Sequence, residues 1–437
     1  DNVMTQEKLA LLGGKPVRSE PLPRYNTIGK AEKDEVMRVL DDGELSGFIA
    51  YAGQEFYGGK QVQALEQQFK DYFKVKNAVA VNSATSGLHC AVAATGIGPG
   101  DEVIVPPYTM GATATCVLFT GAVPVFADIE EKTFCLDPQS VEKNITPYTK
   151  GIIAVNIFGH PAALDEMRAL ADRKGLFLIE DNAQAPAAKD KGRYTGTIGD
   201  AGIFSFNRHK TMQSGEGGMI ICNDDMLAQK MRLVRNHGEV VVRAMGFTDI
   251  VNTVGLNYRM TEMEAAVARH QFAKIDALNE ERVRLADRIT RNLQAIEGIE
   301  APMIRKDCTH AYYFYVMKYN EKKMGIPRDL FVKAVTAEGF TLRAGYVTPI
   351  YLEPLYQQKI CFGPNGFPFT ANPRNANLSY QKGICPVTER MHEKEVILTN
   401  IIYPPLTLAD MDAFTDAMKK VIANKDVLLG YAAKNAA

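Results

Sequence analysis

The chain has 437 residues, of which 46% are hydrophobic and 23% are charged, and its formal net charge is −1. This composition is typical of a globular protein with enough apolar side chains for two domains, and no apolar stretch has transmembrane length. The near-neutral charge does not favour nucleic acid or a membrane surface as a partner.

The cysteines and the first residues bear on metal binding and location. The seven cysteines show no CxxC or CxH spacing, which argues against a zinc site or a disulfide framework, so no metal is expected. Residues 1–12 lack the long apolar core of a secretory signal. A cytoplasmic location is therefore predicted.

Seven short apolar runs in the first half predict β-strands. They lie at Val79–Val81, Val103–Val105, Val123–Phe126, Ile152–Val155, Leu176–Ile179, Gly202–Phe206 and Met219–Cys222. Helical patterns precede two of them, with apolar residues at 62, 65, 69 and 73 and at 164, 167 and 170. Strands without polar alternation, separated by helices, predict an α/β fold with a seven-stranded, mostly parallel sheet flanked by helices.

The second half predicts a smaller domain. A long helix over Thr261–Ile296 is expected to link the two domains, and the tail is expected to end in a helix over Ala409–Ile422. Between them the sequence predicts a strand at 311–318, a helix at 328–338 and an elaborated loop at 354–380. The predicted division is a large domain at 1–275 and a C-terminal α+β domain at 276–437.

Lys210 stands in an unusual local context. It follows the strand-like segment Phe204–Phe206 and precedes the glycine-rich run Gly215–Gly218. Strand alternation places the two phenylalanines on one face and the hydroxyl of Ser205 on the other. A strand that delivers an amine into a glycine loop is typical of a lysine that forms a Schiff base, rather than of a solvated surface lysine.

Two other predicted strands end in polar residues. The strand at 79–81 runs into Ser83–His89, where the free amides of a helix start bind phosphate or where serine simply caps the helix. The strand at 176–179 ends in Glu180 and Asp181, at the sheet edge where ligands collect, although Asp181 also suits an ordinary cap. Pyridoxal phosphate requires such a combination of amine, carboxylate and phosphate cup.

With these segments in view, the chain resembles the sugar aminotransferases of the DegT/DnrJ/StrS type, within the fold-type I pyridoxal phosphate enzymes. The resemblance covers nearly the whole chain. It rests on segments at 14–18, 45–47, 83–89, 100–106, 158–161, 180–181, 204–210 with 215–218, 255–260 and 403–406. It implies a fold-type I architecture and a transaminase.

The resemblance implies two catalytic residues. Lys210 would form the Schiff base and move a proton between the substrate and cofactor carbons, which requires a pKa below its usual ~10.4. Asp181 would pair with the pyridinium nitrogen. The cofactor-binding residues implied with them are Ser83, Ala84, Thr85, Met110, Gln184, Ser205 and Asn257.

The resemblance also implies what several of these residues contact. The backbone of Ala84 and Thr85 and the hydroxyl of Ser205 would hold the phosphate, with Gln184 close to the ring hydroxyl. Asn257 would reach the phosphate of the neighbouring subunit's cofactor, which implies a homodimer with shared active sites.

The chain departs from the family pattern at two positions. Ala84 stands where glycine is usual, and Met110 stands where the family places an aromatic ring over the cofactor. A thioether can lie on an aromatic face, and Tyr108 or another ring is the alternative. His209 is expected to turn away from its neighbour Lys210 and to have a structural role or to support the residues that touch the cofactor. Family members with histidine in place of the lysine are dehydratases, so Lys210 favours amine transfer.

The expected substrate residues are His160, His310 and Tyr351, which fall in segments that the family places around the sugar, although packing alone also accounts for each. The implied reaction takes the amine of L-glutamate or L-glutamine, leaves pyridoxamine phosphate as the intermediate form, and passes the amine to a nucleotide-linked keto-deoxy sugar. A keto-cyclitol such as an inosose is the alternative acceptor. Dehydration of a sugar and a cofactor-binding regulator without turnover are further alternatives.

Overall fold

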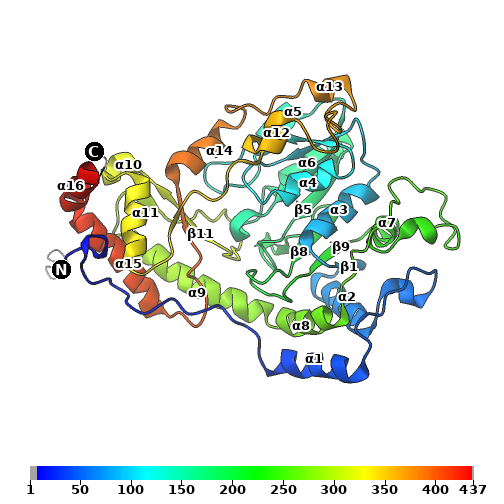
Figure 1. Cartoon of the computed structure of the whole chain (residues 1–437), viewed down its shortest axis with the longest axis horizontal. Helices are drawn as coiled ribbons and strands as arrows, with labels where there is room; N and C mark the ends of the chain where they lie inside the picture. The colour runs from blue at the N-terminus through cyan, green and yellow to red at the C-terminus, as the bar shows by residue number, and fades with distance from the viewer. Residues whose placement is uncertain (1–6, 436–437) are drawn as a thin grey trace.

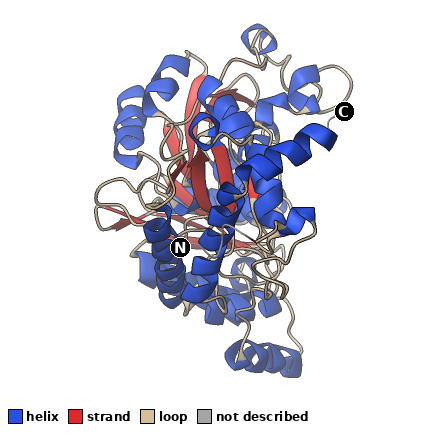
Figure 2. Cartoon of the chain, turned by 90° about the vertical axis from the view of Figure 1, so that its left-hand side faces the viewer, coloured by secondary structure: helices blue, strands red, loops and turns tan. Residues whose placement is uncertain are grey.

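The computed structural model describes residues 7–435, and its largest element is a seven-stranded sheet (Figures 1 and 2). Its order is β1-β9-β8-β5-β4-β2-β3, and β9 alone in this sheet runs antiparallel to its neighbours. The strands are β1 (Asn77–Val81), β2 (Glu102–Val105), β3 (Val123–Phe126), β4 (Thr149–Val155), β5 (Phe177–Asp181), β8 (Ala201–Ser205) and β9 (Gly218–Cys222). The seven predicted strands and the mostly parallel sheet are confirmed.

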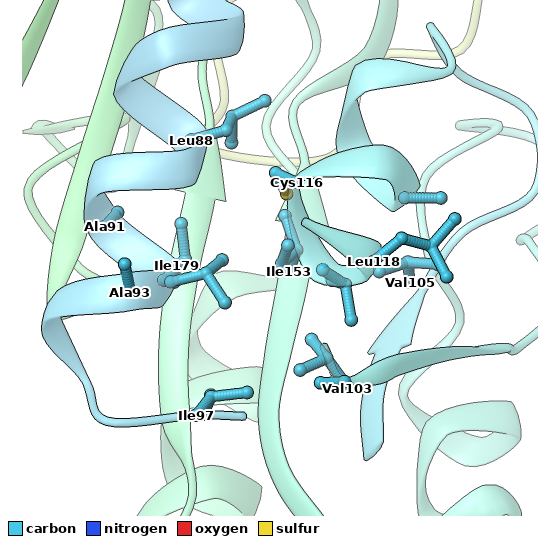
Figure 3. Close-up of a cluster of buried hydrophobic side chains, with 14 of the residues drawn as sticks. Leu88, Ala91, Ala93, Ile97, Val103, Val105, Cys116, Leu118, Ile153 and Ile179 are labelled. Carbon is cyan, nitrogen blue, oxygen red and sulfur yellow. The ribbon is translucent and has the colours of Figure 1, made fainter. Parts of the chain in front are cut away.

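Helices cover both faces of this sheet, which is why its strands read as continuous apolar runs. On one face, α3 (Ala84–Ala94) and α4 (Ala112–Leu118) pack on alternate strand residues such as Ile153 and Ile179 (Figure 3). Helix α7 (Asp225–Arg235) contributes to the same core. The other face is covered by α2 (Lys60–Phe73), α5 (Pro138–Asn144), α6 (Leu164–Lys174) and α8 (Glu262–Phe272). Helix α1 (Lys30–Asp42) lies against α8 (Figure 1).

The C-terminal half forms a second sheet with its own core. The antiparallel order is β10-β11-β13-β12, and the helix α9 packs on α15 beside it. The strands are β10 (Ile299–Glu300), β11 (Tyr315–Tyr319), β12 (Arg343–Ala344) and β13 (Val396–Thr399). The helices are α9 (Ile275–Leu293), α10 (Glu321–Met324), α11 (Arg328–Ala337), α12 (Pro354–Gln358), α13 (Pro373–Ala376), α14 (Pro386–Arg390), α15 (Leu408–Ala423) and α16 (Lys425–Asn435).

The remaining elements are short. A hairpin joins β6 (Lys189–Asp190) to β7 (Arg193–Tyr194). Single helical turns lie at Ala10–Leu12, Gln54–Tyr57, Ile157–Gly159, Gly238–Val240 and Ile350–Leu352, and a π-helical turn lies at Met391–Glu395. Within residues 7–435, no helix has both the length and the apolar character needed to cross a membrane.

Three predicted elements differ from the structure. The single helix expected over 261–296 is two helices, because α8 packs on the core of the large sheet and α9 on that of the small one, with a break at Ala273 and Lys274. The strand expected from residue 311 begins only at Tyr315, since Tyr312 adopts a left-handed conformation with φ of 49°. The tail helix is followed by α16, which the pattern did not predict.

Two segments pack across the predicted boundary near residue 275. Leu9 belongs to the C-terminal core, so the N-terminal segment starts beside α15 and then runs along α9 to α1 (Figure 1). In the other direction, Tyr351, Tyr356 and Tyr380 pack into the core of the large sheet. The division into 1–275 and 276–437 stays a prediction, and residues 1–6 lie outside the described part of the chain.

Candidate active site

A cavity of about 220 Å³ lies where β1, β5 and β8 end, and we call it the lysine cavity. The carboxyl ends of parallel strands share one edge of a sheet, so residues far apart in sequence meet there. Its lining includes Ser83, Ala84, Thr85, Thr109, Met110, Asp181, Gln184, Ser205, Asn207, His209, Lys210 and Glu216. Eight of the nine residues expected to bind the cofactor are therefore together, and Asn257 is the exception.

Lys210 lies in a turn five residues after β8, not on the strand itself. Its amide donates to the carbonyl of Asn207 at 2.9 Å, and its Nζ lies 4.4 Å from the centroid of the Tyr313 ring. Burial lowers the pKa of the Lys210 amine to about 8, although the Asp181 carboxylate favours the protonated form. A substantial neutral fraction near neutral pH is what a nucleophilic or basic lysine requires.

Asp181 is the last residue of β5, and 5% of it is exposed. The hydroxyl of Thr113 donates to Oδ2 at 2.8 Å, and the amide of Ala183 donates to Oδ1 at 3.3 Å. Burial raises the pKa of this carboxyl, while the bond from Thr113 and the charge of Lys210 oppose that rise. No helix begins within the five residues after Asp181, so the alternative that Asp181 is a helix cap is wrong.

The start of α3 combines both interpretations of the Ser83 segment. Ser83 is the N-cap, and its Oγ accepts from the amide of Ser86 at 3.0 Å. Among the described residues, the amides of Ala84 and Thr85 have no protein acceptor. A Cβ at Gly218 would lie 2.8 Å from the amide nitrogen of Ala84, so glycine is required there for this close approach. The serine side chain caps the helix, and the next two amides are free to bind an anion.

Two other side chains in the lysine cavity have defined partners. Gln184 accepts from the amide of Phe158 at 2.7 Å and donates to the hydroxyl of Tyr346 at 2.9 Å. Tyr346 comes from the C-terminal half, so this bond joins the two halves at the cavity. Ser205 ends β8, half-buried, and its Oγ accepts from the amide of Asn207 at 3.3 Å.

Met110 and Tyr108 differ in their surroundings. The side chain of Met110 is 65% exposed and lines the lysine cavity. Tyr108 is 1% exposed, and its hydroxyl accepts from the amide of Tyr346 at 2.7 Å. Tyr108 therefore belongs to the core and does not line this cavity, whereas Met110 does, and its role over a bound ring stays a prediction.

Asn257 lies outside the lysine cavity. Its Oδ1 accepts from the amide of Arg259 at 3.3 Å and from Nε of the same arginine at 3.0 Å, and the residue is exposed. Its predicted contact with the cofactor of another subunit stays a prediction.

The structure places the three expected substrate residues in the protein interior. His160 accepts from the amide of Arg305 at 3.0 Å, and the His310 ring stacks on Tyr312 with centroids 4.0 Å apart. The buried Tyr351 donates to Glu389 at 2.6 Å. None of the three lines the lysine cavity or the larger one beside it, and their role toward the substrate stays a prediction.

Contrary to the expectation, His209 does not turn away from the cavity that contains Lys210. It is exposed and lines both the lysine cavity and the larger cavity, because residues 206–210 form a turn in which strand alternation does not apply. Burial and the nearby Lys210 lower the pKa of the His209 ring, which favours its neutral form.

Three residues at the site carried no sequence signal: Thr113, Tyr313 and Tyr346. Thr113 sits on α4 within an ordinary apolar helix pattern, and the two tyrosines come from loops in the C-terminal half. Their roles depend on contacts over more than 60 residues of sequence separation, such as Thr113 with Asp181.

The lysine cavity fits a phosphorylated aldehyde such as pyridoxal phosphate. It offers free amides for the phosphate, a buried carboxylate for a ring cation, and a lysine amine for the aldehyde. The Oδ1 atom of Asn207 is buried there without a protein partner, which leaves a further polar atom to satisfy.

Comparisons with known proteins show which proteins this chain is similar to. The profile of the DegT/DnrJ/EryC1/StrS aminotransferase family matches residues 48–419. A GDP-perosamine synthase from Caulobacter vibrioides is 36% identical over 326 residues, which are 74% of this chain and 84% of that protein. An L-glutamine:2-deoxy-scyllo-inosose aminotransferase from Streptoalloteichus tenebrarius is 36% identical over 357 residues, 80% of this chain and 83% of that protein.

A solved structure is similar to this chain in its three-dimensional fold as well as in sequence. DesV from S. venezuelae, in complex with a ketimine intermediate, superposes with a TM-score of 0.75 at 31% identity. The match covers 90% of this chain and 94% of that one.

Proposed function

This chain belongs to the DegT/DnrJ/EryC1/StrS aminotransferase family, and from that premise we propose that it moves the amino group of L-glutamate or L-glutamine to the keto carbon of a nucleotide-linked keto-deoxy sugar. The observation that carries the proposal is the meeting of Lys210, Asp181 and the free amides of Ala84 and Thr85 in one cavity. These are the groups that a pyridoxal phosphate transaminase needs.

Each of these residues has its own chemical role. Pyridoxal phosphate, when bound, supplies an aldehyde that condenses with amines and a ring that withdraws electrons. Asp181 holds positive charge at the ring nitrogen, and the amides of Ala84 and Thr85 with the Ser205 hydroxyl hold the phosphate. Lys210, whose pKa of about 8 leaves part of its amine neutral, moves the proton at the reacting carbon.

The acceptor proposal draws on the relatives. One is named for GDP-perosamine and another for an inosose, at equal identity to this chain. The inosose alternative is a keto-cyclitol, which carries no charged group, whereas a nucleotide-linked sugar carries a diphosphate. The cavity beside Lys210 is lined by arginines, which favours the charged acceptor.

The test is a panel of nucleotide-linked keto sugars and keto-cyclitols, each offered with glutamate and with glutamine. The expected product carries nitrogen in place of the keto oxygen, detected by mass, and the donor yields a 2-oxo acid. Turnover of cyclitols alone would replace the first acceptor with the second. Loss of water without gain of nitrogen would indicate dehydration, and no product or 2-oxo acid with any pair would favour a regulator without turnover.

We also propose a homodimer with shared active sites, in the cytoplasm. The exposed Asn257, which lies outside the lysine cavity of its own chain, supports contact with the partner's cofactor phosphate. Mixing Lys210→Ala with Asn257→Ala subunits is expected to restore activity, because one site of each mixed dimer then has both residues. Self-contained sites would give only the average of the two variants.

A further inference from the structure

A second cavity of about 560 Å³ adjoins the lysine cavity, and we call it the arginine cavity. It is lined by Pro23, Arg24, Tyr25, Arg208, His209, Gln213, Arg282, Tyr313, Phe314, Thr341, Arg343, Tyr346, Leu398, Thr399, Asn400 and Tyr403. Four of these are arginines from four separate segments, and no Asp or Glu of residues 7–435 lines the cavity. Its charge is therefore positive and uncompensated.

Arg282 is the most unusual of the four. It lies on α9 and is 3% exposed, whereas Arg24, Arg208 and Arg343 are exposed. One of its nitrogens, Nη1, donates to the carbonyl of Tyr312 at 3.0 Å, and its guanidinium carbon lies 5.0 Å from the centroid of the Tyr25 ring.

Nothing in the described chain neutralises Arg282. Its Nε is buried without a hydrogen-bond partner, and none of the ion pairs within residues 7–435 includes it. A buried charge without a counter-charge is costly, so an anion from outside the chain would resolve the imbalance. Guanidinium groups suit carboxylate and phosphate oxygens because they present paired N–H donors.

The arginine cavity also reaches the reacting amine. Tyr313 lines it, and the face of the same ring lies 4.4 Å from Nζ of Lys210. His209 lines both cavities. A molecule whose anionic group sits among the arginines can therefore extend its other end past Tyr313 to Lys210.

We propose that the arginine cavity binds an oxyanion group of the substrate, a carboxylate or a phosphate, and that Arg282 anchors it. This inference rests on the proposed function in one respect, because it takes the bound molecule to be a substrate. Two sources share the chemistry: the carboxylate of the amino donor, and the diphosphate of a nucleotide-linked sugar.

Calorimetric titration of the pyridoxal phosphate-loaded protein tests the proposal, because the cofactor then occupies its own phosphate site. The two probes are inorganic pyrophosphate, which represents the sugar nucleotide, and glutarate, which represents the donor. Arg282→Gln and the double variant Arg208→Gln/Arg343→Gln are each expected to weaken at least one probe by about tenfold or more. The matched control is Arg284→Gln, an exposed arginine on the same helix that pairs with Glu281.

Each outcome decides the question. A loss confined to pyrophosphate assigns the cavity to the sugar nucleotide, and a loss confined to glutarate assigns it to the donor. Unchanged binding of both probes in the double variant, whose substituted residues are exposed, overturns the proposal even if Arg282→Gln fails to fold. Failure of both probes to bind the parent protein overturns it as well.

The proposed function has a test of its own. It is contradicted if glutamate and glutamine leave the absorbance of the pyridoxal phosphate-loaded protein unchanged, whatever result the titrations give. Conversely, amine transfer at the parent rate together with parent probe affinities in both variants would leave the function intact and remove the role of the arginines.

Discussion

The two cavities at the active site are built in opposite ways. The lysine cavity comes mainly from strand ends and loops of one sheet, and it holds the amine of Lys210 together with the carboxylates of Asp181 and Glu216. The arginine cavity comes from the N-terminal segment, the turn at residue 208, α9 and the small sheet, and its charges have one sign. Charges of both signs suit proton transfer, whereas charge of one sign suits holding a substrate of the other sign.

Removing the amine should give the largest effect and should separate the two cavities most sharply. Lys210→Ala is expected to lower turnover by roughly 10²–10⁴-fold, because it removes the group that moves the proton. The variant should hold pyridoxal phosphate only non-covalently, as measured by absorbance and by mass under denaturing conditions. Pyrophosphate or glutarate binding in the arginine cavity should persist.

The exposed Lys322 of α10 provides the control for this prediction. Lys322→Ala should behave as the parent protein in turnover and in covalent attachment. Parent turnover in Lys210→Ala would remove Lys210 from the mechanism.

Neutralising the carboxylate is the next largest change. Asp181→Asn leaves a ring cation without its buried partner, and loss of one member of a buried pair costs about 3–5 kcal/mol, or roughly a hundredfold or more in rate. Turnover with saturating substrate is the measurement, and thermal unfolding checks that the fold survives. Asp172→Asn, on the exposed side of α6, is the control. An unaltered rate would contradict the role given to Asp181.

The rate of cofactor uptake should change by a factor of about ten per pH unit, and this dependence distinguishes the two cavities. The neutral form of Lys210 reacts with an aldehyde, and its pKa of about 8 means that this form grows as pH rises. Uptake of pyridoxal phosphate by the apoprotein, followed by absorbance, should accelerate about tenfold per unit below pH 8 and level off above it. Within residues 7–435 no lysine lines the arginine cavity, so anion binding there should lack this rise with pH. Acceleration that continues to pH 10 would indicate an ordinary lysine.

The smallest effect concerns the support of Asp181. Thr113→Val removes a 2.8 Å hydrogen bond to a buried carboxylate while keeping the side-chain shape. The expected loss of turnover is about tenfold, in line with a charge-assisted hydrogen bond. Thr115→Val, exposed on the same helix, should have no effect. A loss of the same size in both variants would mean that α4 was disturbed as a whole.

The large sheet and the lysine cavity could be predicted because their signals are local. Each strand is a short run of apolar residues; Asp181 is the last residue of its strand, and Ser83 and Lys210 follow theirs by two and five residues. Position along a parallel strand decides which sheet edge a residue reaches, so the sequence pattern alone brings these residues together.

The remaining features depend on contacts that no local pattern encodes. Arg282 reads as one of several basic residues on an amphipathic helix, and only packing against Tyr25 and Tyr312 makes it buried. The break at Ala273 contains neither glycine nor proline, so it arises from the two cores that α8 and α9 serve. His160 and Tyr351 were assigned to the substrate by resemblance, whereas their burial follows from tertiary contacts.

The N-terminal segment has a consequence for how the chain is made. One carboxylate, that of Glu338, accepts from the amides of Ala10 and Val17 and from Nζ of Lys420. On the ribosome, residues 10 and 17 emerge hundreds of residues before residue 420, so this junction closes only after residue 420 has been synthesised. Arg24 and Tyr25 follow directly on that segment and line the arginine cavity. A nascent chain can therefore complete the lysine cavity before it completes the arginine cavity.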